Sequence, residues 1–458
     1  MGARATPLRL TGVNFPAYGW GDANFPREAI MQARTFRGVD YRRVAALRMN
    51  VVRLNLAYHL FEHAGHPFHY HADGWEWLDA QVARAQAAGV YLILDMHAPQ
   101  GGYQAPGYTG DFWENPAPRA RLKALWVEIA RRYRTEAQVA AYSLLNEPCT
   151  NGRNDLWVAY AQEAVDAIRT VDAQHLIVVE QDVEAMIPFV LDDSNLLYEF
   201  HCYEPWRYAA QFWRYGFQGR YGDPRTPILP WAWVEGDAGG ATFMVTDARI
   251  AGLMPLLAGE VAGARFEILE REQNGAEALL MCVHVTSDPP PNGLITVADN
   301  PLPMAASLWT SATTTQRKCE RLAFPVRQGC RYTIVGAKNG ELAPLYYKSD
   351  EAFAPLTRAT IEARLLGEYG LAFYREHGAP VNVGEYGLSP HAFKHERGGA
   401  QWLADRLDLY AQYDLSSQYW VYSGAADFAL YDNRDRYPTP RHANPHALAV
   451  FREKSPGG

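Results

Sequence analysis

The 458-residue sequence contains no run of about 18 apolar residues, the length that a membrane-spanning helix requires. It also contains no basic block, and its net charge is −8, so neither a membrane span nor a nucleic-acid partner is expected. The first ten residues lack the apolar segment of a secretory signal. A cytoplasmic protein and a secreted protein whose leader has been removed therefore both stay open.

Cysteine is scarce, with five residues, an odd number, and none at the spacing of a metal site. This argues against a full disulfide framework, although Cys319 and Cys330 could pair within one hairpin. The run His69-Tyr70-His71 has two histidines at a spacing that some metal sites use. No strand-end ligands of metallohydrolase type accompany it, so we expect no metal and no cofactor.

Aromatic residues, by contrast, are abundant, with 13 Trp and 27 Tyr. Flat aromatic rings suit the apolar faces of sugars, but a large core with tyrosines at its rim would explain the excess equally well. Five tryptophans fall in segments that should overhang an active site, and some of them are candidate sugar platforms: Trp113, Trp206, Trp213, Trp231 and Trp233.

Short apolar runs alternate with longer helical patterns, which is the rhythm of βα units. A parallel strand buried on both faces gives a near-continuous apolar run, as in residues 90–97. Amphipathic helices are predicted between the strands, and the one at 75–89 ends at a glycine. Eight strands are predicted, at 8–15, 50–58, 90–97, 139–148, 175–182, 195–205, 379–387 and 416–424.

Eight strands with intervening helices predict an α/β fold, a closed (β/α)8 TIM barrel. An open doubly wound sheet is the alternative. No glycine-rich phosphate loop follows the first strand, and polar residues end many strands instead of two, so the barrel is favoured.

The rhythm breaks between residues 236 and 347, where alternating segments and turns replace helical periods. Asn274-Gly275, for example, is a strong hairpin signal. A structureless loop of that length would be unusual. We therefore predict a small all-β, sandwich-like domain at 236–347, inserted after strand six, with the barrel formed by residues 1–235 and 348–458. The insertion could bind polysaccharide, wall off part of a cleft or brace the barrel.

Polar and aromatic residues gather at the carboxyl ends of the predicted strands, where the active site of such a barrel forms. Packing alone would not call for this collection. Asp95 should also point into the barrel mouth as support, and Glu180 could contact substrate or be a buried partner. The main candidates are Arg53, His97, Asn146, Glu147, His201, Tyr203, Glu385 and Trp420.

Two carboxylates stand out among these candidates. Glu147 ends strand four and Glu385 ends strand seven, and these strands face one another across an eight-stranded barrel. Cleavage of a glycosidic bond needs such a pair, in which one group protonates the leaving oxygen and the other attacks the anomeric carbon or activates water. A lone strand-end glutamate is more often a surface ion-pair partner, but the pair in these contexts favours catalysis.

The ordered motifs RLN, DMH, LNEP, HCY, GEYG and YWVY resemble glycoside hydrolase family 5, the cellulase-like retaining (β/α)8 hydrolases. The resemblance covers the chain apart from the inserted region. It implies that Glu147 is the general acid/base and Glu385 the nucleophile. It also implies a surrounding shell of Arg53, His97, Asn146, His201, Tyr203 and Trp420.

The resulting hypothesis is a retaining O-glycosyl hydrolase that acts on β-linked glucan, β-glucoside or β-mannan through a covalent glycosyl-enzyme. Its partner is then a β-linked oligo- or polysaccharide. A transglycosylase with the same residues and a non-catalytic carbohydrate-binding barrel are the alternatives, and a metallohydrolase is a third. The exact sugar, the linkage and endo or exo action depend on loop contacts that the sequence does not define.

Overall fold

The structure is a computed structural model of the chain, and two compact units are described separately. The first comprises Met1–Tyr203, Ile361–Pro390 and Ala400–Gly458, and the second Glu204–Thr360 and His391–Gly399. The residues described are 8–16, 36–63, 65–102, 104, 110–203, 206–209, 221–222, 241–242, 256–259, 264–271, 278–285, 294–297, 317–322, 331–335, 357–393, 397–424, 428–432 and 443–455.

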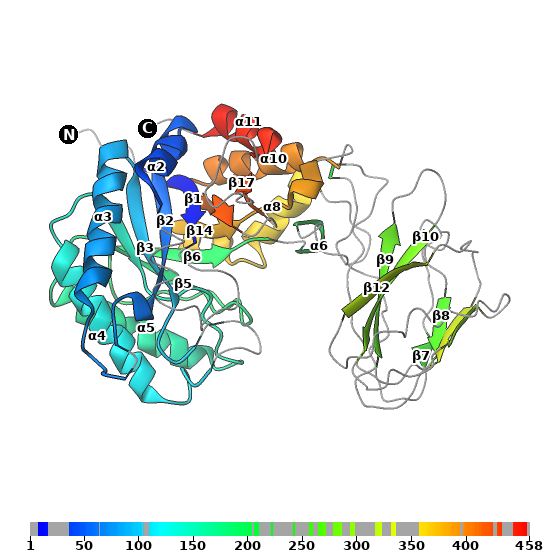
Figure 1. The fold of residues 1–458 in the computed structure, drawn as a ribbon, viewed down its shortest axis with the longest axis horizontal. Helices are drawn as coiled ribbons and strands as arrows, with labels where there is room; N and C mark the ends of the chain where they lie inside the picture. Colours follow the sequence, from blue (N-terminus) through cyan, green and yellow to red (C-terminus); the bar gives the residue numbers. More distant parts are fainter. Residues whose placement is uncertain are drawn as a thin grey trace. The chain divides into compact units, whose positions relative to one another are not determined.

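The first unit contains a closed barrel in the order β1-β15-β14-β6-β5-β4-β3-β2 (Figure 1). Every neighbouring pair is parallel. The predicted (β/α)8 barrel is confirmed, and the open doubly wound alternative is wrong. The strands are β1 Thr11–Phe15, β2 Val51–Ala57, β3 Tyr91–Ala98, β4 Val139–Ser143, β5 Leu176–Glu180, β6 Leu196–His201, β14 Val381–Tyr386 and β15 Ser416–Tyr419.

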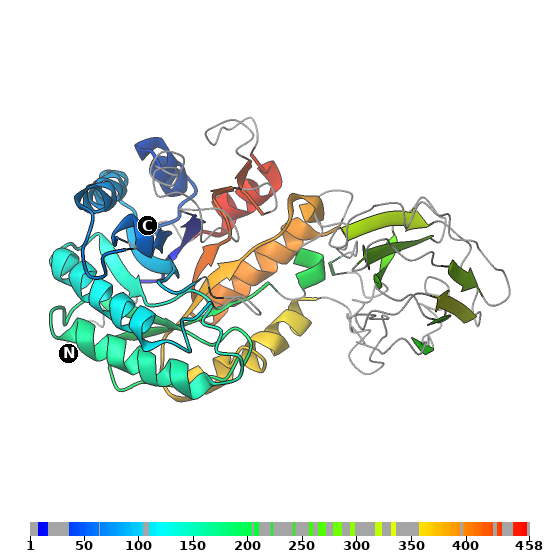
Figure 2. The same cartoon turned by 60° about the horizontal axis from the view of Figure 1, so that its bottom comes forward.

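Helices surround the barrel on its outer side (Figures 1 and 2). α3 ends at Gly89, whose φ of 67° lies in the left-handed region that glycine adopts readily. No helix in the described ranges is long and apolar enough to cross a membrane. The helices of this part of the chain are α2 Gly38–Ala46, α3 Ala72–Ala88, α4 Pro116–Tyr133, α5 Asn154–Arg169, α8 Arg358–Leu366, α9 Leu371–Glu376, α10 Gly399–Gln412 and α11 Pro445–Lys454.

One helical segment differs from the sequence-based expectation. The pattern of residues 355–378 predicts a single long helix, but α8 ends at Leu366 and α9 begins at Leu371. Gly370 lies between them with φ 70°, outside the right-handed helical region. A glycine inside a helical pattern is therefore a break here, and the single-helix prediction is wrong.

One layer of the barrel interior is apolar, and five successive strands, β2 to β6, contribute to it. Its buried residues include Val51, Ile93, Ala141, Val178 and Leu197. Alternate residues of a strand point to the same face, so the residue two positions further along each strand also points inward. Those five residues are Arg53, Asp95, Ser143, Glu180 and Glu199, all buried. A polar layer thus lies directly above the apolar one, towards the carboxyl ends of the strands.

Two tryptophans fix the ends of β4 and β5 from the outside. The Trp126 indole donates to the Leu144 carbonyl at 2.9 Å, and the Trp157 indole donates to the Glu180 carbonyl at 2.7 Å. Both rings are fully buried. Because a buried indole N–H needs an acceptor, the helices α4 and α5 are tied to the strand ends from which the polar layer projects.

The described strands of the second unit form two sheets. β12 Arg317–Leu322, β10 Ala278–Val285 and β9 Ala264–Arg271 form an antiparallel sheet in that order. β11 Leu294–Val297, β13 Arg331–Val335, β8 Leu256–Gly259 and β7 Ala241–Thr242 form the other. All seven strands fall within residues 236–347. Cys330 lies outside the described residues, so its pairing with Cys319 stays a prediction.

Candidate active site

Arg53 lies at the centre of the polar layer and is fully buried. A guanidinium offers five donors in a rigid fork, and here it faces acceptors from several strand ends. Burial lowers the pKa of Arg53, but the surrounding carboxylates outweigh this and raise it, so the side chain is a permanent cation. Its contacts are Glu385 Oε1 at 3.1 Å, Asn14 Oδ1 at 3.1 Å, Asn146 Oδ1 at 3.0 Å, Glu199 Oε1 at 3.1 Å and Asp95 Oδ1 at 2.9 Å.

Glu385 lies in β14, and its two carboxylate oxygens have different partners. Oε1 accepts from Arg53, and Oε2 accepts from the Tyr203 hydroxyl at 2.7 Å. The residue is only 4% exposed. Burial raises the pKa of Glu385, against the lowering effect of His201 and Arg53. These two donors hold the carboxylate in one orientation, and Arg53 opposes the cost of burying its charge.

Glu147 follows β4 and has a φ of 44°, which is uncommon for a residue other than glycine. Its main-chain N–H donates to Glu180 Oε2 at 2.8 Å. Its carboxylate Oε1 lies 2.9 Å from Nδ1 of His201. Burial acts to raise the pKa of Glu147, but the hydrogen bond and charge of His201 outweigh it and lower the pKa. Of the described residues other than glycine that have a positive φ, Glu147 is the one that is a candidate catalytic group.

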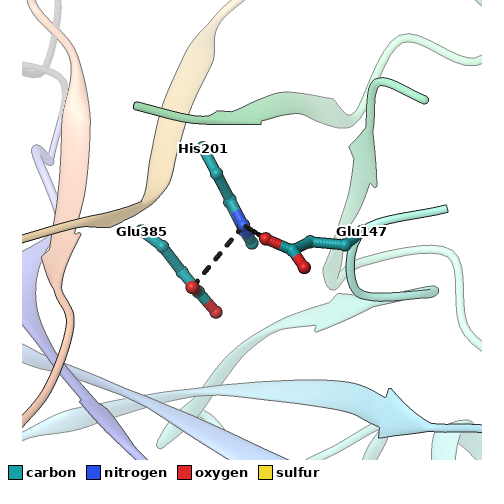
Figure 3. A group of neighbouring side chains, drawn as sticks. All are labelled: Glu147, His201 and Glu385. Carbon is teal, nitrogen blue, oxygen red and sulfur yellow. Dashed lines mark hydrogen bonds and ion pairs between the residues drawn. The ribbon is translucent and has the colours of Figure 1, made fainter. Parts of the chain in front are cut away.

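His201 lies between the two carboxylates (Figure 3). Its Nδ1 is 2.9 Å from Glu147 Oε1 and 3.6 Å from Glu385 Oε2. One carboxylate oxygen of Glu147 and one of Glu385 lie within 4.8 Å of each other. On the shorter way round the barrel, only β5 and β6 separate β4 from β14. The structure thus brings together two strand-end carboxylates that are far apart in the sequence.

His97, Asp95 and Trp420 form a second connected group. The His97 Nδ1 is 2.9 Å from Asp95 Oδ2, and its ring stacks on Trp420 with centroids 5.5 Å apart and planes 9° apart. Asp95 also pairs with Arg53, and burial, which raises its pKa, is outweighed by Arg53, so its pKa is lowered. The ionised carboxylate of Asp95 accepts a hydrogen bond from Nδ1 of His97 and so orients the ring.

Asn146 precedes Glu147, and the two polar atoms of its side-chain amide, Oδ1 and Nδ2, have different surroundings. Its Oδ1 accepts from Arg53, which fixes the orientation of the amide. Its Nδ2 is buried and has no hydrogen-bond partner among the residues that the structure describes. A buried amide N–H without a partner costs free energy unless a ligand supplies an acceptor.

The remaining sequence candidates lie in different places. Trp113 is 3% exposed and donates to Gln104 at 2.7 Å, so it offers no open face to a sugar. Glu180 is a buried partner of Glu147, one of the two possibilities that its strand-end position left open. Trp213, Trp231 and Trp233 lie outside the described residues, and the side chain of Trp206 does as well.

The residues described contain two groups that offer three ligand atoms within 4.8 Å, namely Glu147–His201–Glu385 and Glu180–Glu199–His201. Arg53 lies 3.1 Å from a carboxylate of each group. A permanent cation at that distance opposes binding of a second one. Neither group includes His69 or His71.

Two contacts of Arg53 were absent from the sequence-based candidates. Asn14, at the end of β1, also donates to the Gly384 carbonyl at 2.9 Å, next to Glu385. Glu199 accepts from Asn382 as well as from Arg53. Alternation along the sixth strand was a usable signal, because Glu199 and His201 are two residues apart and point to the same face.

A family model described as Cellulase (glycosyl hydrolase family 5) matches residues 20–278, which is more than half of the chain. The chain belongs to glycosyl hydrolase family 5. The resemblance seen in the sequence motifs is therefore confirmed. The matched range of family 5 contains Arg53, Glu147 and His201 but ends before Glu385, so the position of Glu385 in the site comes from the structure.

Curated relatives are similar over part of their length. A β-xylosidase from Phanerodontia chrysosporium is 27% identical over 186 residues, which cover 38% of this chain and 39% of the relative. Endoglucanase C from Acetivibrio thermocellus is 27% identical, with 38% and 51% covered. An endoglucanase from Paenibacillus polymyxa is 27% identical, with 50% and 62% covered. The chain spans less than two thirds of the length of these family relatives.

Solved structures share the fold at low identity. The endoglucanase Cel5A from Thermotoga maritima has a TM-score of 0.53 and 13% identity, with 96% of each chain covered. The cellulose synthase subunit Z from Clostridioides difficile has a TM-score of 0.53 and 14% identity, with 97% of this chain and 99% of that chain covered. These likenesses support the barrel fold of this family 5 member.

Proposed function

We propose that this chain is a retaining glycoside hydrolase that cleaves β-linked glucan, β-glucoside or β-mannan by double displacement. The observation that carries the proposal is the pair Glu147 and Glu385, which offer carboxylate oxygens within 4.8 Å of one another. Carboxyl groups of retaining enzymes are about 5–5.5 Å apart, whereas an inverting pair stands roughly 6.5–9.5 Å apart. The short spacing supports direct attack by a carboxylate over attack by an intervening water.

In the first step, an oxygen of Glu385 attacks the anomeric carbon while Glu147 gives its proton to the leaving oxygen. The glycosidic C–O bond breaks, a glycosyl ester of Glu385 forms, and the aglycone leaves as an alcohol. Arg53 and Tyr203 hold Glu385 by one oxygen each. Both oxygens are therefore held in a fixed orientation, and the carboxylate stays ionised until the bond forms.

In the second step, Glu147 acts as a base. It takes a proton from a water molecule, whose oxygen attacks the anomeric carbon and displaces Glu385. The sugar leaves with its original configuration, and Glu147 is protonated for the next cycle. The exchange of roles needs a group beside Glu147 that stabilises its ionised form, and His201 at 2.9 Å supplies that stabilisation.

The surrounding residues suit a sugar at the cleavage point. The Nδ2 of Asn146, without a partner in the ranges that the structure describes, can donate to the 2-hydroxyl, a contact that strengthens as the ring flattens towards the oxocarbenium-like transition state. The ring of His97, oriented by Asp95, can bind another hydroxyl through Nε2. The Trp420 ring, stacked on His97, supplies an apolar face.

We also propose that residues 236–347 form a separate all-β domain inserted after β6. The seven strands between Ala241 and Val335, arranged in two sheets, support this division. Limited proteolysis tests it: cleavage near both boundaries with a protected fragment between them is the expected result. Even cleavage throughout 236–347 would contradict the proposal.

The function is tested by product analysis on barley glucan, carboxymethylcellulose, mannan, xylan and aryl β-glycosides. The wild type should release sugar whose first-formed anomer, followed by proton NMR, is β. Glu385→Ala should abolish turnover, whereas Glu376→Gln, at an exposed position in α9, should not. Oligosaccharide binding without hydrolysis would instead indicate a carbohydrate-binding protein, and near-wild-type turnover by Glu385→Ala would refute the assignment.

A further inference from the structure

Glu180, at the end of β5, contacts the acid/base by two routes. Its Oε2 accepts the main-chain N–H of Glu147 at 2.8 Å. Its Oε1 lies 3.4 Å from Nε2 of His201, and the Nδ1 of the same ring is 2.9 Å from the Glu147 carboxylate. Glu180 is only 2% exposed, and its own carbonyl is held by the Trp157 indole.

We propose that Glu180 is a positioning residue for Glu147: it holds the main chain that carries the acid/base and, through the ring of His201, strengthens the binding of the proton that His201 and Glu147 share. The proposal rests on the acid/base role of Glu147 proposed above. It adds a residue that touches neither the sugar nor the reacting atoms.

The main-chain contact acts on a strained position. Glu147 has a φ of 44°, a conformation that residues other than glycine rarely adopt and that the surroundings must hold in place. The peptides on either side of Glu147 are tied to strand ends, with Asn146 N–H donating to Met96 and Val183 N–H donating to the Pro148 carbonyl. The carboxylate of Glu180 binds the N–H between them and so fixes the direction in which the Glu147 side chain leaves the chain.

The contact through His201 acts on charge. The ring Nε2 is buried and makes no well-formed hydrogen bond within the described residues. It faces two carboxylates, Glu180 at 3.4 Å and Glu199 at 3.6 Å. An N–H on this nitrogen is therefore favoured by charge, and the loss of either carboxylate would weaken it.

Ionisable groups from four other strands or strand ends surround this pair. Besides Glu180 on β5, they are Arg53 on β2, Glu147 after β4, Glu199 on β6 and Glu385 on β14. Burial lowers the pKa of His201, but these carboxylates, Glu180 first, raise it well above the ordinary value. Burial also raises the pKa of Glu180, against the lowering effect of His201 and Arg53.

A chain of three groups follows from these contacts. His201 exchanges a proton with Glu147 on its Nδ1 side and faces Glu180 on its Nε2 side. The pair Glu147–His201 is ready for the first step while it retains the shared proton. If the negative charge of Glu180 is removed, the pair loses that proton at a lower pH.

Glu180→Gln tests this chain, because its amide oxygen can still accept the Glu147 N–H while the charge is gone. We expect the basic limb of the kcat/KM profile on an aryl β-glycoside to move to lower pH by about one unit. The matched control is Asp182→Asn. Asp182 accepts the Thr150 N–H at 2.8 Å in the same loop but contacts neither Glu147 nor His201 in the described contacts, so its basic limb should not move. If the basic limb of the kcat/KM profile of Glu180→Gln coincides with that of the wild type, the proposal is overturned.

Glu180→Asp separates the two contacts. It keeps a carboxylate but shortens it by one methylene, so the basic limb should return towards the wild-type position while kcat is reduced. If Glu180→Asp instead behaves like Glu180→Gln in its pH profile, charge is not the operative property and the proposal is wrong.

A direct measurement covers the case in which Glu180→Gln does not fold. In wild-type protein with 15N-labelled histidine, the His201 ring should stay doubly protonated well above the ordinary range of histidine, and an ordinary titration would overturn the proposal. If the proposed function itself is wrong, the wild type will hydrolyse no glycoside, an outcome that is distinct from either titration result. Failure of this inference alone leaves an active enzyme whose pH profile ignores residue 180.

Discussion

The hydroxyl of Tyr203 donates to Oε2 of Glu385 at 2.7 Å, while Arg53 binds the other oxygen of the same carboxylate at 3.1 Å. Tyr203 follows β6 and Arg53 lies in β2, so the carboxylate of β14 is held from two other parts of the barrel. A carboxylate that accepts a charge-assisted hydrogen bond on each oxygen has little freedom to rotate. Its orientation is set before any sugar binds.

Tyr203→Phe should move the acidic limb of kcat/KM to higher pH. The hydroxyl stabilises the ionised form of Glu385, so its removal raises the pKa of a carboxyl that burial already raises. The active form is the ionised one, and activity is lost as the pH falls through that pKa. We also expect kcat to fall by about tenfold to a hundredfold.

A matched control exists for this change. The Tyr413 hydroxyl donates to the Glu362 carboxylate at 2.6 Å, away from the site. Tyr413→Phe removes the same kind of hydrogen bond and should leave both pH limbs in place. An unshifted acidic limb in Tyr203→Phe would argue against Glu385 as the group that must be ionised.

Glu147→Gln should make the rate depend on the leaving group. Substrates with poor leaving groups need the acid, so their kcat/KM should fall by about 10²–10⁴. Dinitrophenyl glycosides leave without protonation and should show a burst followed by slow turnover, which azide accelerates by attacking the glycosyl-enzyme. Glu184→Gln, at an exposed position in the loop after β5, is the control. Equal losses on good and poor leaving groups would contradict the acid role.

Asn146→Ala should reduce kcat/KM on a β-glucoside by about tenfold to a hundredfold but have a much smaller effect on the 2-deoxy substrate. The reason is that Nδ2 of Asn146, which has no hydrogen-bond partner in the described part of the chain, has the 2-hydroxyl as its proposed acceptor. Asn55→Ala removes another buried amide, one that donates to Asp95 at 2.8 Å, and should affect both substrates equally. Equal losses of kcat/KM on both substrates in Asn146→Ala would contradict the proposed contact.

Exhaustive chelation should leave the rate unchanged. Arg53, within 3.1 Å of Glu385 and Glu199, already supplies the positive charge that a metal ion would bring to these carboxylates. Activity measured after EDTA treatment and dialysis, with and without added Zn²⁺, checks this. Loss of activity on chelation, with recovery when metal is added, would favour the metallohydrolase hypothesis.

The barrel and most of its polar residues could be predicted from the sequence because strand burial leaves a direct mark. The near-continuous apolar run at 90–97 is a strand, and two-residue alternation places Asp95 and His97 on the inner face. Glu199 could have been found in the same way from His201.

Other features depended on contacts that no local pattern encodes. The φ of Glu147 and its bond to Glu180 arise from the packing of two loops. Trp113 has the composition of a sugar platform, yet it is buried against Phe112 and Trp157. Exposure of a loop tryptophan is a tertiary property, so the sequence could name candidates but could not choose between them.

The central claim is that Glu385 forms the covalent bond to the sugar. A 2-deoxy-2-fluoro glycoside with a good leaving group forms the glycosyl-enzyme but slows its hydrolysis, so the ester can be located by peptide mass spectrometry. The account predicts one added fluorosugar on the peptide that carries Glu385. A label on the peptide that carries Glu147, or turnover of ordinary aryl glycosides with no label on either peptide, would contradict it.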